Sequence, residues 1–314
     1  ILEVAGKNPI KVGIEQTSAL EELKSLNKDS VVVFELSSWR LSALGRYKLS
    51  PQVAVITNIF PDHLNYYGTM KDYIEDKKYI CISQKPQEFC VLNWDDEILN
   101  KIESEIGSQI IKISQNKISQ GKSVYTNNGT IYFNDGVDEK KVIDISDIKL
   151  RGEHNLSNIL AAIGAAYAIG ADFASICNAI EEFKGVPHRL EFVREFEKVK
   201  YYNDTAATNP GSAISGINSF SEPIVLICGG SDKNLDMAGF AKAIAEKAKK
   251  VVFLKGAATD KIISSLKAQE ARHDFVITNS MDEAVVEARK IASAGDVILL
   301  SPGSASFGLF LNEF

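Results

Sequence analysis

Short apolar runs alternate with amphipathic segments along the first third of the chain. A run at 10–14 is followed by a helical pattern, and the later runs at 30–36, 51–59 and 89–94 are nearly continuous. Continuous runs of this length are typical of strands that are covered on both faces. Because segments of helical spacing separate the runs, the pattern predicts a parallel sheet in an α/β fold.

The pattern changes between about residues 116 and 149. The stretch "SVYTNNGTIYFNDG" at 123–136 places an Asn-Gly pair between two alternating segments, which predicts a β-hairpin. We expect this hairpin to be a small antiparallel addition to the sheet. The stretch at 152–171 is rich in alanine and predicts a long buried helix that Gly170 closes.

A second α/β series follows a hinge at Gly185 and Pro187, which break the helix expected at 173–183. We therefore expect an incomplete, mostly parallel central domain at 1–185 and a Rossmann-like, doubly wound domain at 186–314. Ligands of such sheets bind at the carboxyl ends of the strands. The strands expected in the second domain are 199–204, 223–230, 250–256, 274–278 and 295–303. Their ends carry Asn203-Asp204, Gly229-Gly230 and Ser301-Pro302-Gly303.

Charge and composition exclude several classes of protein. The net charge is −6 and no basic stripe stands out, which argues against nucleic acid as a partner. The four cysteines lack metal-type spacing and are interpreted as reduced thiols of a cytoplasmic protein. The longest apolar stretch, 159–170, is too short to span a bilayer, and no signal peptide is visible. We expect a monomer that does not bind membranes.

Three side chains near strand ends in the first domain are candidates for chemistry. Glu35 follows a strand and is either a cap of the next helix or a Mg²⁺ ligand, because a carboxylate leaving a buried strand needs a partner. His63 is either a solvated loop residue or a less usual ligand of the same ion. Lys77 is either a surface lysine with a buried stem or a buried cation that must be paired or modified.

Further candidates lie on the helix before the hinge, on the hinge itself and in the second domain, and each has two interpretations. Asn155 and Asn158 lie three apart at a helix start, where they share one face and form either a cap with a surface amide or a binding pair. Arg189, on the hinge, is either a bidentate phosphate donor or part of an ion pair between domains. Lys233 is either a solvated loop residue or a cation for an acidic substrate.

Eight motifs in one order resemble the Mur ligase family over essentially the whole chain. They are "ELSSWRL", "TNIFPDHLNYYG", "DYIEDKK", "GEHNLSN", "GVPHRLE", "YNDTAATNP", "GGSDKNLD" and "LLSPGSASF". Within the family the chain is most similar to the ligase that joins D-glutamate to UDP-N-acetylmuramoyl-L-alanine in peptidoglycan precursor synthesis. The resemblance implies an ADP-forming reaction in which ATP phosphorylates a carboxylate and an amine attacks the acyl phosphate.

The resemblance also implies roles for single residues. Glu35 and His63 would hold Mg²⁺, and Lys77 would be carbamylated and support a second Mg²⁺. For ATP, the matching positions are Asn155, Asn158, His188, Arg189 and Asp204. For D-glutamate they are Thr208, Lys233 and Ser306, while Ser37 would contact the carboxylate region of the acceptor.

Some features depart from the family pattern. No phosphate-binding G-x-x-x-x-G-K-[ST] loop is present, since "CGGSDKN" has the wrong spacing. The chain looks cut from a longer one, and we expect it to be inactive by itself. Ala206 stands where lysine is usual, and Arg40 where glutamine is usual. Two alternatives therefore remain, a non-catalytic scaffold subunit and a family ligase for another amino acid. A dehydrogenase is excluded because no G-x-G-x-x-G follows a strand.

Overall fold

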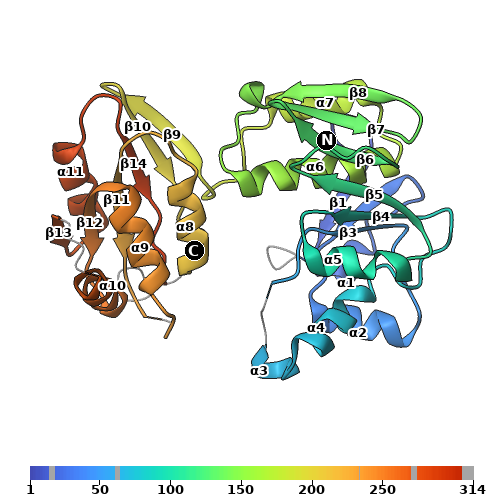
Figure 1. The fold of residues 1–314 in the computed structure, drawn as a ribbon, viewed down its shortest axis with the longest axis horizontal. Helices are drawn as coiled ribbons and strands as arrows, with labels where there is room; N and C mark the ends of the chain where they lie inside the picture. Colours follow the sequence, from blue (N-terminus) through green and yellow to red (C-terminus); the bar gives the residue numbers. More distant parts are fainter. Residues whose placement is uncertain (14–17, 61–63, 233, 270–273, 306–314) are drawn as a thin grey trace. The chain divides into compact units, whose positions relative to one another are not determined.

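The computed structural model describes residues 1–13, 18–60, 64–232, 234–269 and 274–305. The chain divides into two compact units (Figure 1). Unit 1 comprises Ile1–Lys149 and Asn155–Phe183, and unit 2 comprises Leu150–His154 and Lys184–Phe314. Both units are built from sheets with helices against them, so the expected α/β class is confirmed.

Unit 1 contains a six-stranded sheet in the order β3-β4-β5-β6-β7-β8. The first four strands run parallel, and β7 and β8 are antiparallel additions. The strands are β3 Val53–Ile56, β4 Phe89–Asn93, β5 Gln109–Ser114, β6 Ser123–Asn127, β7 Thr130–Asn134 and β8 Glu139–Asp144. The hairpin expected at Asn128-Gly129 is confirmed, because both residues have positive φ (50° and 77°) between the paired strands β6 and β7.

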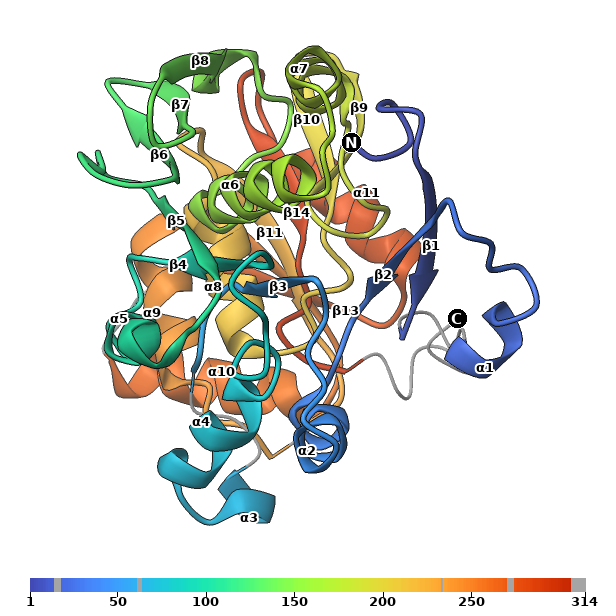
Figure 2. The same cartoon turned by 90° about the vertical axis from the view of Figure 1, so that its right-hand side faces the viewer.

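Two further strands of unit 1, β1 (Asn8–Val12) and β2 (Ser30–Phe34), form a parallel sheet of their own (Figure 2). The expectation that β2 is covered on both faces is wrong. Val32, Val33 and Phe34 are 44, 47 and 41% exposed. Within the described residues β2 pairs with β1 alone, so its apolar side chains lack the second layer that covers β4.

Helices cover both faces of the central strands of unit 1. Cys90 and Leu92 of β4 pack in a core with Tyr73 and Cys81, from α4 and the turn after it. Val91 faces the other way and meets Gly164 of the long helix expected at 152–171, which is confirmed as α6. The helices of unit 1 are α1 Ala19–Glu22, α2 Ser38–Arg46, α3 Leu64–Tyr67, α4 Met70–Lys78, α5 Glu97–Ile102, α6 Glu153–Ala168 and α7 Phe173–Glu182.

Unit 2 is a six-stranded sheet in the order β13-β12-β11-β14-β10-β9. All neighbours are parallel except β9, which lies antiparallel at the edge beside β10. The five expected strands are confirmed, whereas β9 was placed within the hinge and missed. The strands are β9 Glu191–Phe196, β10 Val199–Asn203, β11 Ile224–Gly229, β12 Ala248–Leu254, β13 Phe275–Thr278 and β14 Val297–Leu300.

The sheet of unit 2 is wound on both faces, as the alternation of β11 shows. Leu226 and Cys228 belong to one core with side chains of α8, α9 and α10. Val225 and Ile227 belong to a second core with Ala284 of α11. The helices are α8 Pro210–Asn218, α9 Ala238–Lys247, α10 Ala257–Ala268 and α11 Met281–Ile291. The expected doubly wound arrangement is therefore confirmed.

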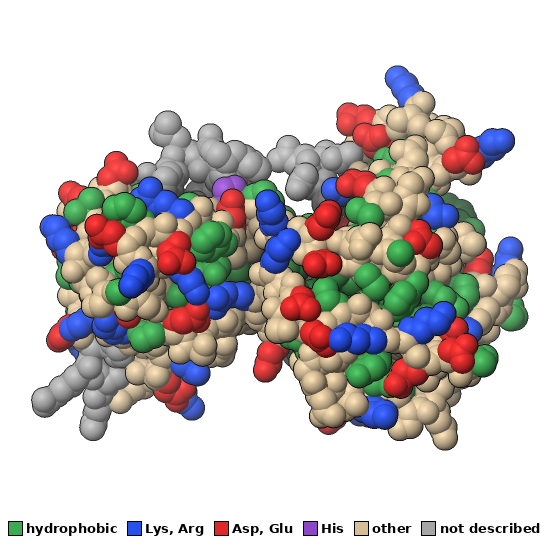
Figure 3. Space-filling model, turned by 90° about the horizontal axis from the view of Figure 1, so that it is seen from above, with side chains coloured by type: hydrophobic (Ala, Val, Ile, Leu, Met, Phe, Trp, Pro, Cys, Tyr) green, Lys and Arg blue, Asp and Glu red, His purple; other side chains and the backbone are tan. Residues whose placement is uncertain are grey.

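Basic and acidic side chains are mixed over the face of the protein in Figure 3, without one basic area. Within the described ranges, no helix has both the length and the apolar character needed to cross a membrane.

Candidate functional site

Glu35 stands at the end of β2 with an exposed side chain. Its backbone carbonyl accepts a hydrogen bond from Arg40 Nη1 at 3.3 Å, and the Arg40 guanidinium also lies 5.9 Å from the centre of the Phe34 ring. The cap of α2 is Ser37, whose hydroxyl accepts from the backbone N–H of Arg40 at 3.4 Å. The interpretation of Glu35 as the helix cap is therefore wrong, and its carboxylate is an oxygen ligand of the kind that Mg²⁺ prefers.

Ser38, the first residue of α2, is 2% exposed, and its hydroxyl completes no hydrogen bond of good geometry with the residues that the structure describes. The buried hydroxyl of Tyr67 likewise completes none of good geometry. Burial raises the pKa of the Tyr67 hydroxyl, with the nearby carboxylate of Asp76 acting in the same direction and Ser38 opposing it. A buried hydroxyl without a good hydrogen bond costs free energy. These two hydroxyls form a polar region beside Ser37 that the sequence did not reveal.

A series of aromatic rings joins this turn to Lys77. The Trp39 and Tyr66 rings are 5.9 Å apart, the Tyr66 and Tyr67 rings 4.9 Å, and the Tyr67 and Tyr73 rings 5.3 Å. The Nζ of Lys77 lies 5.5 Å from the centre of the Tyr73 ring. Aromatic faces attract cations, so the Tyr73 ring favours the ammonium group of Lys77. The series of rings connects α2, through α3, with α4.

Lys77 and its neighbour Lys78 occupy different surroundings on α4. Lys77 is half-buried, whereas Lys78 is 5% exposed and pairs with the carboxylates of Glu75 and Glu105. Burial alone would lower the pKa of the Lys78 ammonium, but the bonds to Glu105 and Glu75 raise it. Lys78 is thus a buried cation paired with two carboxylates, whereas the Nζ of the half-buried Lys77 faces the Tyr73 ring.

Two side chains at and just after the end of β4 hold the segment that follows β3, which precedes His63 in the sequence. Asn93 Nδ2 donates to the carbonyl of Thr57 at 2.8 Å, and Asp96 accepts from the backbone N–H of Ile59 at 2.9 Å. His63 itself lies outside the described residues. Among those described, no cluster of three or more histidine, cysteine or acidic side chains is arranged to hold a metal ion.

Asn155 and Asn158 both lie in the first turns of α6. Because α6 begins at Glu153, Asn155 is inside the helix and is not its cap. Asn158 is exposed on the same face. Between them, the hydroxyl of Ser157 accepts a hydrogen bond from Gln115 Nε2 at 2.8 Å, which ties the start of the helix to the segment after β5.

In unit 2 the three expected strand ends meet. The backbone N–H of Asp204 donates to Leu300 O at 2.8 Å, and that of Gly229 donates to Pro302 O at 2.9 Å. Ser301 N donates to the carbonyl of Ile227 at 3.0 Å. The ends of β10, β14 and β11 therefore form one continuous edge, as the carboxyl ends of parallel strands should.

Two carboxylates hold the turn that carries His188 and Arg189. Glu191 Oε2 accepts from the backbone N–H of His188 at 2.9 Å, and Asp204 Oδ1 accepts from that of Leu190 at 3.1 Å. His188 and Leu190 have φ of 65° and 45°, a conformation that costs free energy in residues other than glycine. The bonds offset that cost and leave the Arg189 side chain exposed between the two residues.

Asp204 is itself 6% exposed. Its second oxygen accepts from the Ser301 hydroxyl at 2.7 Å. Burial raises the pKa of the Asp204 carboxyl, while Ser301, the Leu190 N–H and the charge of Arg189 oppose the rise. The carboxylate is thus engaged inside the unit, where it positions the turn of Arg189.

The residues expected to bind an amino acid are only partly described. Thr208 is half-buried next to Asn209, whose side chain caps α8. Lys233 and Ser306 lie outside the described residues. Beside the first of them, Asp232 pairs with Lys261, and this pairing lowers the pKa of the Asp232 carboxyl.

Two shallow surface pockets of about 440 and 460 Å³ contain none of the expected site residues. The first lies between α9 and α10 and is lined in part by Asp236 and Asp260. The second lies beside Trp94 and Lys112, where the lysine Nζ is 3.6 Å from the centre of the indole ring. Neither pocket is part of the site built from the strand ends.

Both halves of the chain match known family models. Residues 7–166 match the Mur ligase middle domain, and residues 188–303 match the Mur ligase, glutamate ligase domain. The UDP-N-acetylmuramoylalanine–D-glutamate ligase of Roseiflexus sp. (strain RS-1) is 40% identical over 305 residues, which cover 95% of this chain and 66% of the relative. The ligase of the same name from Clostridioides difficile (strain 630) is 36% identical over 99% of this chain and 67% of the relative.

Solved structures agree at the level of the fold. A crystal structure of MurF from Acinetobacter baumannii superposes with a TM-score of 0.71 at 18% identity, covering 96% of this chain and 70% of that protein. The UDP-N-acetylmuramate-alanine ligase MurC from Thermotoga maritima gives 0.65 at 22% identity, covering 97% and 67%. Since the family models cover both units and the relatives extend over nearly the whole chain, this chain belongs to the Mur ligase family.

Proposed function

We propose that this chain belongs to a ligase that joins D-glutamate to UDP-N-acetylmuramoylalanine in peptidoglycan biosynthesis, with ATP as the energy source. The observation that carries the proposal is 35–40% identity over nearly the whole chain to ligases of that name. The chain spans about two thirds of the length of these relatives. We further propose that the protein is a cytoplasmic monomer, with ATP, UDP-N-acetylmuramoylalanine and D-glutamate as its small-molecule partners.

The proposed reaction has two steps. An oxygen of the UDP-N-acetylmuramoylalanine carboxylate attacks the γ-phosphorus of ATP, and the bond to the bridging oxygen breaks, which releases ADP. The amine of D-glutamate then attacks the acyl carbon, and phosphate leaves from the tetrahedral intermediate. Anions must approach each other in both steps, so charge neutralisation and positioning are the main tasks of the site.

Unit 1 would supply the groups around the acyl phosphate. Glu35, with its exposed carboxylate, and His63 would hold Mg²⁺, which when bound offsets the negative charge of the phosphates. Lys77 would act as its carbamate, a modification that turns a half-buried cation into an anion suited to a second ion. Ser37 lies at the start of α2, where the backbone N–H groups of a helix favour an anion such as the acceptor carboxylate.

Unit 2 and the start of α6 would bind ATP and the amino acid. Asn155 and Asn158 would contact the adenine of ATP. His188 and Arg189 would contact the phosphates of ATP. Asp204 would bind the ribose only through a rearrangement of its two internal bonds, so we assign it mainly to positioning Arg189. Thr208, Lys233 and Ser306 would bind the two carboxylates of D-glutamate.

The test is an amino-acid screen on the protein encoded by the complete gene, with ATP and UDP-N-acetylmuramoylalanine and with phosphate release as readout. We expect release that depends on D-glutamate. Release with another amino acid and none with D-glutamate would keep the family and reject the substrate. Binding of a partner protein with no release under any condition would favour the scaffold alternative.

A further inference from the structure

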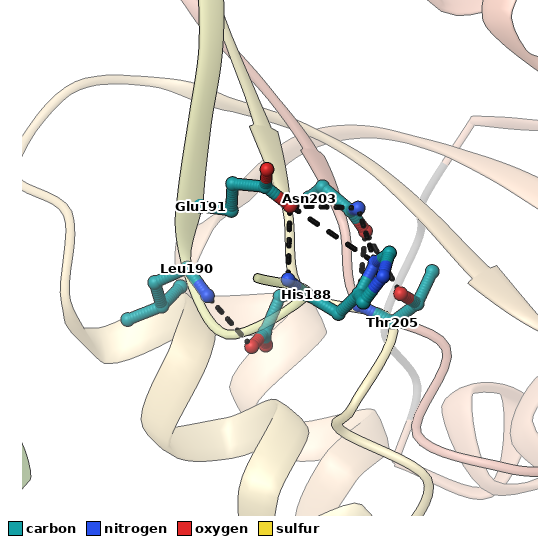
Figure 4. A network of polar contacts seen from close by, with 6 residues as sticks. His188, Leu190, Glu191, Asn203 and Thr205 are labelled. Atoms are coloured by element: carbon teal, nitrogen blue, oxygen red, sulfur yellow. Dashed lines mark hydrogen bonds and ion pairs between the residues drawn. The ribbon is translucent and has the colours of Figure 1, made fainter. Parts of the chain in front are cut away.

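Asn203, the last residue of β10, faces the imidazole of His188 across the hinge turn (Figure 4). Its Nδ2 lies 2.9 Å from His188 Nδ1 and 3.2 Å from Glu191 Oε2. Its Oδ1 accepts from the backbone N–H of Thr205 at 3.2 Å and from the Thr205 hydroxyl at 2.9 Å. Every polar atom of the amide is therefore engaged.

The orientation of this amide follows from its partners. A backbone N–H can only donate, so the atom of Asn203 that faces Thr205 N must be the carbonyl oxygen. A carboxylate can only accept, so the atom that faces Glu191 must be the amide nitrogen. The second N–H of that nitrogen points at His188 Nδ1. A neutral imidazole has one donor and one acceptor nitrogen, and Nδ1 here has to be the acceptor.

We infer that Asn203 and Glu191 are positioning residues that hold neutral His188 in the tautomer protonated at Nε2. The backbone of the histidine is held as well. Glu191 accepts a hydrogen bond from the N–H of His188, and the N–H of Ala206 donates to the carbonyl of His188 at 3.0 Å. The His188 side chain is 65% exposed. In this tautomer the ring presents one N–H donor of defined direction to solvent.

The ligand of that donor follows from its chemistry, and this step rests on the proposed function. An exposed Nε2–H on the residue that precedes the exposed Arg189 suits an anionic oxygen, and we assign it to a phosphate oxygen of ATP. Arg189 supplies the charge, and His188 supplies a directional hydrogen bond. The tautomer itself does not depend on the ligand, so the two parts can be tested separately.

The tautomer is measured by long-range ¹H–¹⁵N correlation NMR on the ¹⁵N-labelled 314-residue chain, at a pH about two units above the ordinary histidine pKa of roughly 6.5. The chain has four histidines, and the signals that disappear in His188→Gln identify the ring. We expect the pattern of an imidazole protonated at Nε2. A ring protonated mainly at Nδ1 overturns the inference.

Variants show whether Asn203 causes the preference. In Asn203→Asp the new carboxylate can only accept, so we expect the proton to move to Nδ1. Because that carboxylate stands next to Glu191 and can disturb folding, Asn203→Ala provides a second test, in which both tautomers become populated. Asn218→Ala, at the exposed end of α8, is the control and leaves the spectrum unchanged. An unaltered Nε2–H tautomer in Asn203→Ala refutes the role of Asn203.

Addition of ATP tests the ligand. We expect the Nε2 signal of His188 to shift, and the dissociation constant for ATP to rise about tenfold in Asn203→Ala, as for the loss of one hydrogen bond. If the wild-type signal has the Nε2–H pattern but does not respond to ATP, the assignment of the phosphate oxygen is wrong while the tautomer stands. Failure of the phosphate-release assay instead refutes the proposed reaction.

Discussion

The hydroxyl of Ser301 donates a hydrogen bond of 2.7 Å to the buried carboxylate of Asp204, although 97 positions separate the two residues in the chain. The bond joins the end of β14 to the end of β10. The other oxygen of Asp204 holds the N–H of Leu190, so the bond transmits the position of the sheet edge to the turn that carries Arg189.

Ser301→Ala should destabilise the protein by about 1–3 kcal/mol, because it leaves one oxygen of a buried carboxylate without its donor. The loss is measured as a shift of the midpoint of urea unfolding. Ser221→Ala removes an exposed hydroxyl of the same unit and should change the midpoint little. Equal midpoints for Ser301→Ala and wild type would show that the bond adds no stability.

Gly216→Ala tests the space around the same carboxylate. A Cβ at Gly216 would lie 2.6 Å from Asp204 Oδ2, so the substitution should destabilise the protein even though alanine favours helices. Gly239, in α9, is the matched control, since its Cβ would meet nothing closer than 3.7 Å. Gly239→Ala should stabilise the protein, by up to about 1 kcal/mol. The midpoint of thermal unfolding should therefore fall in Gly216→Ala and rise in Gly239→Ala.

Arg151 gives the stability of unit 2 a dependence on acid pH. Its guanidinium donates to Glu222 at 3.0 Å and lies 5.3 and 5.2 Å from the ring centres of Tyr202 and Phe220. The pKa of the Glu222 carboxyl is lowered to about 2, because the bonds and charges of Arg151, with Lys200, outweigh the opposing effect of burial. A lowered folded-state pKa stabilises the protein above the unfolded-state value and loses that effect as the pH falls.

The expected loss lies between about pH 4.5 and pH 2, from the ordinary glutamate pKa down to the folded-state value. Arg151→Met should lower stability by about 1 kcal/mol near neutral pH and flatten the pH profile in this window. Urea unfolding at a series of pH values provides the measurement. A profile of unchanged slope in the variant would assign the acid sensitivity to other carboxylates.

Substitutions of Lys77 and Lys78 should separate chemistry from stability. Lys77→Gln should reduce phosphate release by at least about a hundredfold, the scale of losing one electrostatic contact to the transition state, with little change in thermal unfolding. Lys78→Met should chiefly alter stability, because that ammonium is buried between Glu75 and Glu105. Full activity of Lys77→Gln, in the protein encoded by the complete gene, would remove Lys77 from the proposed site.

The local pattern of the sequence predicted most elements but missed β5, β8 and β9 and misjudged β2. In β9, Phe192, Val193 and Phe196 are 52, 56 and 48% exposed. The strand lies at the edge of the sheet, and its sequence shows neither strict alternation nor a continuous apolar run. Its partner is β10, which begins three residues later. For β2, a continuous apolar run did not mean a covered strand, since coverage depends on elements from elsewhere in the chain.

The meeting of the strand ends in unit 2 was predicted from the sequence, but the side chains that hold the hinge turn beside them were not. The strand ends of unit 2 were identified because parallel strands place their carboxyl ends at one edge. Glu191 was missed, and Asn203 was named only as part of a strand end, since a carboxylate after a hinge and an amide before an aspartate have no distinctive pattern. Their role becomes visible only where two backbone N–H groups and an imidazole converge on them.

By itself the sequence determined most of the helices and strands in their order, the Asn-Gly hairpin and the strand ends that meet at one edge of unit 2, because these depend on residues close together in the chain. Only the tertiary structure decided that Leu150–His154 packs with unit 2 through Arg151, that Asp204 is held by Ser301, and that Lys78 is buried between the carboxylates of Glu75 and Glu105. Such choices depend on burial and on partners from distant segments, which local periodicity does not record.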